Sequence, residues 1–262
     1  VHPVELAMGG DTPALRAGIL SALATGCVIV GGFLFLKRQK SLGELRRLSY
    51  YRDLWEREQE KLKQKLVKTD ITRWIFEGEK IKETDQGSDA KCKEDTPCEP
   101  LLRVGGVDIS FLKGSDEALA SLVVLDFRTL KVVYTDFQKV RMINPYIAGF
   151  LAFREVDVLA NLLGKLRREN PELYPQVTLV DGNGVLHPRG FGLASHLGVI
   201  TGSPTIGIGK NLHSIDGLMR HEVERDFKRE VKEGKRCFTV LRGKSSTIHG
   251  IALQTTEKST KP

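Results

Sequence analysis

The sequence contains little cysteine, with four residues in a chain of 262. The positions of Cys27, Cys92, Cys98 and Cys237 lack the spacing of a disulfide framework. Cys92 and Cys98 match no zinc-binding pattern, because no histidine follows them nearby. We interpret all four as free thiols of a reducing compartment, which excludes a small secreted domain stabilised by disulfides.

Acidic residues are missing from one long segment, since neither Asp nor Glu occurs between Gly182 and Ile215. Basic groups position phosphates, and glycines let a backbone approach a ligand closely. The segment has both, because it is rich in glycine and contains Arg189, Lys210, His187, His196 and His213. Such a segment suits a phosphodiester substrate.

The positive charge is concentrated in the second part of the chain. Residues 101–262 contain 23 Lys and Arg against 17 Asp and Glu, whereas residues 1–100 contain 17 against 16. The net charge of the whole chain is +7. This distribution favours a polyanionic partner such as nucleic acid.

Charge is also missing from residues 17–36, which are long enough for a membrane-spanning helix of about 30 Å. Only Arg16 precedes the run, whereas five basic residues follow it: Lys37, Arg38, Lys40, Arg46 and Arg47. A membrane anchor would therefore place the C-terminal side in the cytosol. A signal peptide would need its charges on the other side of the run, and the third interpretation is an incorrect gene model.

The rest of the chain divides where its composition changes. Residues 1–47 form an N-terminal extension that contains the candidate span. Apolar residues recur at helical spacing from Leu48 to Val67, so we expect residues 48–76 to hold the N-terminal helix of the main domain. Residues 77–100 are polar, which predicts a disordered insertion, and residues 101–262 form the main domain.

Alternating patterns in the main domain predict an α/β fold. Three apolar segments joined by short polar turns predict an antiparallel meander: Val104–Phe111, Ala118–Asp126 and Lys131–Asp136. Helices and strands then alternate: a helix opened by Pro145 that runs through residues 149–168, a strand at Gln176–Val180, a short helix at Gly190–Val199, a strand at Thr205–Gly209 and a charged helix at Asp216–Glu233. We expect a mixed sheet, with the meander followed by parallel strands, flanked by helices.

Three carboxylates fall where a charge is unfavourable. Asp108 interrupts an apolar strand, Asp181 ends another, and Glu155 lies on the apolar face of its helix. Burial of several unpaired carboxylates needs compensating cations, and magnesium prefers such oxygen ligands. The alternative gives each a local role: Asp108 bonded to the backbone, Asp181 in a turn, and Glu155 at the edge of the apolar face.

Pro145, Tyr146 and Ile147 precede the predicted helix in a turn that can expose an aromatic ring. A ring beside a basic cleft can stack on a base or wedge into a base step. The alternative is an ordinary hydrophobic staple at the helix start.

We interpret His196, in the predicted short helix, as a packed, hydrogen-bonded residue rather than a catalyst.

Four segments in this order, VGGVDISF, PYIAGFLAFREV, LVDGNGVLHPRGFGLASHLGV and GIGKNL, resemble the endonuclease V family, especially its animal members. The resemblance covers the chain from about Leu54 to Pro262, except for the polar insertion. It implies a ribonuclease H-like fold and a magnesium-dependent endonuclease, with Mn²⁺ as an alternative metal. The implied substrate is inosine-containing single-stranded RNA or deaminated DNA. The implied cut falls one phosphodiester beyond the bond 3′ of the inosine and leaves a 5′-phosphate.

The same resemblance implies roles for particular residues. Asp108 and Asp181 correspond to the metal-binding aspartates, Glu155 to the third carboxylate, and Lys210 to a lysine at the rim of the active site. Tyr146 corresponds to a wedge residue between Pro145 and Ile147. The remaining implied nucleic-acid contacts are Gly182, Asn183, Gly184 and His187 in the pocket for the altered base. From its place in the basic, acid-free segment, we also expect Arg189 to contact nucleic acid by positioning phosphate.

The chain departs from the family pattern after Pro262, where family members continue into a strand and a Gly-His segment with an active-site histidine. We therefore predict a fragment, and its first residue, Val1 rather than Met, agrees with this. The competing hypothesis is a nucleic-acid-binding module with impaired catalysis. We expect a monomer, and the resemblance implies a location in the cytoplasm and the nucleus, including the nucleolus. Anchoring through residues 17–36 would place the nuclease domain at a membrane.

Overall fold

The computed structural model describes residues 42–69, 73–75, 98–232 and 237–254. The chain divides into two units, Val1–Tyr51 and Arg52–Pro262, and each is treated by itself. The candidate span at residues 17–36 lies outside the described residues. Among the described residues, none of the helices combines the length and the apolar character that crossing a membrane requires.

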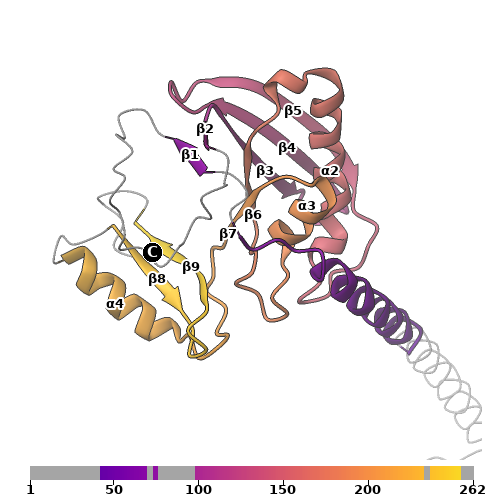
Figure 1. Ribbon diagram of the computed structural model, residues 1–262. Helices are drawn as coiled ribbons and strands as arrows, with labels where there is room; N and C mark the ends of the chain where they lie inside the picture. The colour runs from indigo at the N-terminus through magenta and orange to yellow at the C-terminus, as the bar shows by residue number, and fades with distance from the viewer. Residues whose placement is uncertain (1–41, 70–72, 76–97, 233–236, 255–262) are drawn as a thin grey trace, which may run out of the picture. The chain divides into compact units, whose positions relative to one another are not determined.

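A five-stranded mixed sheet forms the centre of the second unit (Figure 1). Its antiparallel part consists of β3 (Arg103–Phe111), β4 (Glu117–Asp126) and β5 (Val132–Arg141). Its parallel part adds β6 (Val177–Asp181) beside β3 and β7 (Thr205–Ile208) beside β6. The order β5-β4-β3-β6-β7 confirms the predicted meander followed by parallel strands.

Two helices cover one face of this sheet. Helix α2 (Ala152–Glu169) packs on β3, β4 and β5, and α3 (Leu193–Thr201) packs on β6 and β7. The core between them is apolar, with Val107, Leu122, Leu159, Val180 and Leu197 almost fully buried. Because side chains alternate along a strand, the residues next to Val107 and Val180 point to the opposite face.

The C-terminal part of the described chain forms a smaller layer. Helix α4 (Arg220–Lys232) packs against β8 (Phe238–Arg242), which pairs with β9 (Ile248–Leu253) in an antiparallel hairpin. A second apolar cluster of Leu218, Val223 and Leu241 lies between them. Leu186 and Leu212 pack against this cluster, so the layer is in contact with the long loop after β6.

The helix expected to begin at Pro145 begins instead at Ala152. Gly149 has a φ of 84°, which ends any helical path through the preceding turn. The turn is held from inside, because the Asn144 side-chain amide donates a hydrogen bond to the Phe153 carbonyl at 2.9 Å. Pro145, Tyr146 and Ile147 therefore lie in a loop before the helix.

Other boundaries also differ from the predictions. The N-terminal helix spans residues 42–63 rather than 48–76. Two three-residue strands pair in parallel, β1 (Arg73–Ile75) within that expected helix and β2 (Cys98–Pro100) within the expected insertion. The β8–β9 hairpin was not predicted, and β5 extends beyond Asp136 to Arg141. A short 3-10 helix, η1 (Pro171–Leu173), connects α2 to β6.

Candidate active site beside strands β3 and β6

Asp108 and Asp181 occupy neighbouring positions on two parallel strands. Val107 of β3 pairs with Val180 of β6, so the next residue of each strand is an aspartate on the face away from the α2 core. Asp108 is exposed and accepts a hydrogen bond from the Ile109 amide at 2.8 Å. The expectation that Asp108 is buried is therefore wrong, because only one face of β3 is covered by helices.

Glu155 is the buried carboxylate of the site. It lies in the first turn of α2 and is only 5% exposed. Burial raises the pKa of Glu155 to about 7; the nearby Arg154 opposes this shift, and Asp108 and Asp181 add to it. Within the described residues, Glu155 has neither a hydrogen bond from a side chain nor an ion pair.

Lys210 balances part of this negative charge. Its Nζ atom lies 2.6 Å from Oδ2 of Asp181. The hydrogen bond and the charge of Asp181 raise the pKa of Lys210, with a smaller contribution from Asp108. Lys210 lies two residues after the end of β7, so the aspartates of β3 and β6 and this lysine come from three neighbouring strands or their ends.

The donor chemistry of these three carboxylates fits a divalent metal ion, since hard cations take oxygen ligands. The buried Glu155 carboxylate, which has no side-chain partner in the described part of the chain, needs the compensation that a cation gives. As the described side chains stand, no three His, Cys, Asp or Glu residues close around one ion. Coordination by all three carboxylates therefore requires their side chains to turn toward one another.

The Gly182–Gly184 turn is packed tightly against β7. A Cβ atom at Gly207 would lie 2.5 Å from the Gly184 amide nitrogen and 2.6 Å from the Gly182 carbonyl oxygen. The carbonyl of Asn183 accepts a hydrogen bond from the amide of Ala194 at the start of α3. This close approach fixes the turn beside Asp181, where the sequence predicted part of a base pocket.

His187 lies in the same loop beside His213, with ring centroids 6.0 Å apart. Burial, together with the smaller effect of the charges of His213 and Arg189, lowers the pKa of His187 to about 4. The ring is therefore neutral at physiological pH. It also accepts a hydrogen bond from the Arg189 amide through Nδ1.

Arg189 contacts the N-terminal helix. Its Nη1 atom lies 2.7 Å from a carboxylate oxygen of Glu56, and its Nε atom donates to the side-chain oxygen of Gln59. The guanidinium also lies over the ring of Phe150, 5.4 Å from the centroid. The side chain is 31% exposed, and its contact with phosphate stays a prediction.

The turn before α2 separates an exposed ring from a buried anchor. Tyr146 is 65% exposed, whereas Ile147 is 5% exposed. The sequence left two alternatives open, a hydrophobic staple and an exposed ring, and the turn contains both. Ile147 packs as an anchor, while the Tyr146 ring is available to a partner. Pro145 precedes them and is half-buried.

His196 lies in the core rather than at the site. Its ring contacts Phe153 and Phe191, with centroid distances of 4.9 Å and 5.4 Å. Burial lowers its pKa to about 4, and among the described residues its Nδ1 atom has no hydrogen-bond partner. The packed part of the interpretation is confirmed, and Nδ1 does not show the hydrogen bonding that was expected of the residue.

Sequence reasoning missed Gln59, which is 2% exposed and contacts two segments around the site. The available signal was its helical spacing from Trp55, which places an amide on an otherwise apolar face.

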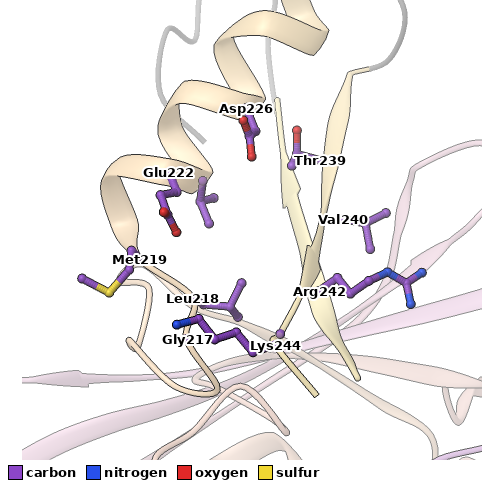
Figure 2. A pocket seen from close by; sticks show the side chains of 11 residues that line it. Gly217, Leu218, Met219, Glu222, Asp226, Thr239, Val240, Arg242 and Lys244 are labelled. Carbon is purple, nitrogen blue, oxygen red and sulfur yellow. The ribbon is translucent and has the colours of Figure 1, made fainter. Parts of the chain in front are cut away.

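A cavity of about 280 Å³ lies away from the three carboxylates, between α4 and β8 (Figure 2). Its lining combines Glu222 and Asp226 with Arg242 and Lys244 and includes none of the three carboxylates.

Known proteins are similar to this chain in sequence and in fold. The family model described as Endonuclease V matches residues 87–262. Human Endonuclease V is 44% identical over 210 residues, covering 80% of this chain and 68% of the human protein. Mouse Endonuclease V is also 44% identical, and the chain spans just 56% of its length.

Solved structures agree with this assignment. The catalytic domain of human Endonuclease V matches with a TM-score of 0.64 and 43% identity, covering 81% of this chain and 79% of that one. Ciona intestinalis Endonuclease V matches with a TM-score of 0.65 and 32% identity, covering 82% and 81%, and is in complex with DNA containing an inosine followed by a ribo-adenosine. The predicted ribonuclease H-like α/β fold is confirmed. The chain belongs to the endonuclease V family, a family of metal-dependent endonucleases.

Proposed function

We propose that this protein is a magnesium-dependent endonuclease that cuts nucleic acid strands containing inosine. The observation that carries the proposal is the juxtaposition of Asp108 and Asp181 on paired strands, with Lys210 bonded to Asp181 and the buried Glu155 nearby. The complex of the Ciona relative with inosine-containing DNA supports the choice of lesion.

Asp108, Asp181 and Glu155 would hold the metal, with Mn²⁺ as an alternative to Mg²⁺. The bound metal supplies activation of a water molecule and stabilisation of the leaving oxygen. Water attacks phosphorus, the bond from phosphorus to the 3′-oxygen breaks, and the products carry a 5′-phosphate and a 3′-hydroxyl. Lys210 contributes a positive charge beside the phosphate that develops negative charge during the displacement.

Selection of the altered base would depend on the loop after β6 and on the turn before α2. The packed Gly182, Asn183 and Gly184 form a rigid wall next to Asp181. The neutral ring of His187 offers a hydrogen-bonding edge without a charge. The exposed Tyr146 ring would fill the space of an extruded base, as side chains do in enzymes that flip bases.

The cut would fall one phosphodiester beyond the bond on the 3′ side of the inosine. We further propose single-stranded RNA and deaminated DNA as substrates, a monomeric protein, and a location in the cytoplasm and the nucleus. Sedimentation of the full chain and microscopy of a tagged chain test the last two points. An oligomer in sedimentation, or a tag confined to membranes, would contradict them.

The decisive experiment uses RNA and DNA oligonucleotides that contain one inosine, with adenosine oligonucleotides as controls. The chain should cut the inosine strands in Mg²⁺ at the stated bond, and Asp108→Ala should remove the cutting. Chelation of divalent metal should also stop it. Tight inosine-specific binding without any cutting would replace the proposal with a recognition module.

A further inference from the structure

Gln59 is a buried amide whose oxygen and nitrogen contact three residues in two other segments. It lies on the N-terminal helix and is 2% exposed. Its Nε2 atom donates to the Phe191 carbonyl at 2.9 Å and to the Gly149 carbonyl at 3.3 Å. Its Oε1 atom accepts a hydrogen bond from Nε of Arg189. All of its side-chain polar groups are therefore used.

These three partners belong to the two segments that flank the carboxylates. Gly149 closes the turn that carries Tyr146, and its φ of 84° sets the direction of the chain into α2. Arg189 and Phe191 belong to the loop that carries His187. The two segments are about forty residues apart in sequence, and a single amide from a third segment bonds to both.

Aromatic packing keeps this amide away from water. Trp55, one helical turn before Gln59, stacks on Phe153 with an interplanar angle of 7° and a centroid distance of 5.4 Å. Phe150 lies under the Arg189 guanidinium, and Phe191 contacts the His196 ring. Hydrogen bonds in such surroundings are strong and costly to leave unmade, so the relative position of the two segments is well defined.

We propose that Gln59 is a positioning residue that holds the Tyr146 turn at a fixed distance from the His187 loop, and so sets the discrimination between inosine and adenosine. The inference rests on the proposed function of these segments and adds a residue that touches neither the metal ligands nor the exposed ring. Gln59 acts only through the backbone of Gly149 and Phe191 and the side chain of Arg189.

The experiment compares Gln59→Met with Gln176→Met. Methionine has a similar length and cannot replace the hydrogen bonds. Gln176 is the control, because its side chain also makes three hydrogen bonds, to backbone groups of Pro100, Leu102 and Arg103 at the end of β2 and the start of β3. Gln59→Glu is the second variant, since it keeps the volume and the acceptor for Arg189 but loses the donor to both carbonyls.

The first readout is amide hydrogen exchange in the substrate-free protein. Gln59→Met and Gln59→Glu should accelerate exchange at Phe150, which donates to Ile147, and at Gly192, which donates to Gly184, by about tenfold. Gln176→Met should leave both amides unchanged. Unchanged exchange at Phe150 and Gly192 in both Gln59 variants would overturn the proposal, whatever the protein's activity.

The second readout is kcat/KM on inosine and adenosine strands. Gln59→Met should lower kcat/KM for inosine by about ten- to a hundredfold, as displaced positioning elements do, with little change for adenosine. In the background of Tyr146→Ala the effect of Gln59→Met on kcat/KM should shrink to less than about threefold, because the two residues act together.

A wild-type chain that cuts nothing refutes the proposed function, while faster exchange in the Gln59 variants still supports the coupling of the two segments through Gln59. An active chain whose discrimination survives Gln59→Met overturns the positioning role.

Discussion

Asp108 and Asp181 are brought side by side by the parallel pairing of β3 and β6, although 73 positions separate them in the sequence. Each strand by itself contributes only one of the two aspartates, and the pairing brings them together. The pairing Val107–Val180 fixes the register, because a slip of one residue would move one aspartate into the α2 core. The site is therefore as rigid as the sheet, even though Asp108 itself is exposed.

Removal of one of these charges should abolish cutting and leave the fold intact. Asp108→Asn should lower kcat by more than about a thousandfold, since the metal loses a ligand. Its free energy of unfolding should change by less than about 0.5 kcal/mol, because Asp108 is exposed. Single-turnover cleavage and urea unfolding measure the two effects. Asp157→Asn, an exposed aspartate on α2, is the control and should keep full activity.

Lys210 should matter for chemistry and little for stability. Lys210→Met should reduce kcat by about ten- to a hundredfold, because a charge beside the reacting phosphate is lost. The ion pair with Asp181 is largely exposed at the lysine, so its loss should change the free energy of unfolding very little. Lys139→Met on β5 breaks a comparable exposed pair, 2.9 Å long, with Glu117 on β4, and should leave kcat unchanged. Equal losses in the two variants would contradict a local role for Lys210.

Glu155→Gln should stabilise the metal-free protein at pH 8 while it abolishes activity. Burial raises the pKa of Glu155 from 4.5 to about 7, so the folded state favours the protonated acid. The contribution of this preference to the free energy of unfolding is fully present below pH 4.5 and is lost as the pH rises through 7. The loss amounts to about 3 kcal/mol at pH 8, and a neutral glutamine avoids it.

Urea unfolding with a chelator, at several pH values between 4.5 and 8, measures this difference. The two proteins should be nearly equal at the acidic end and diverge as the pH rises. Saturating Mg²⁺ should narrow or reverse the difference at pH 8, because only the wild-type carboxylate binds the metal. A difference independent of pH would show that the carboxylate does not titrate in this range.

The sheet and the three carboxylates could be predicted because local patterns report them. Apolar alternation identified β3, β4, β6 and β7, and the charges interrupted or ended those patterns. The β8–β9 hairpin was missed because its strands are short and partly polar, as in Thr239 and His249. Their structure depends on packing with α4, which sequence periodicity does not report.

The environment of each site residue was harder to predict than its identity. Asp108 is exposed because the face of β3 opposite α2 has no helix over it among the described elements, a fact about tertiary packing. Arg189 is paired because Glu56 and Gln59, 133 and 130 positions away, lie beside it. Such partners are set by the fold, so composition and spacing do not report them.

His196 should make the protein sensitive to acid. Burial lowers its pKa from 6.5 to about 4, so the folded state favours the neutral ring. Its contribution to stability is present above pH 6.5 and is lost as the pH falls through 4, by about 3 kcal/mol. His196→Leu removes this titration, and its cost at pH 8 should be small because Nδ1 has no hydrogen-bond partner to lose.

The measurement is the free energy of unfolding between pH 8 and pH 4 in wild type, His196→Leu and His221→Leu. The wild type should lose stability steeply below pH 6.5, and His196→Leu should lose distinctly less. His187, whose pKa is also lowered to about 4, keeps part of the slope in every variant. His221 is exposed on α4, so its replacement should leave the slope unchanged. Parallel curves for all three proteins would mean that protonation of His196 does not oppose folding.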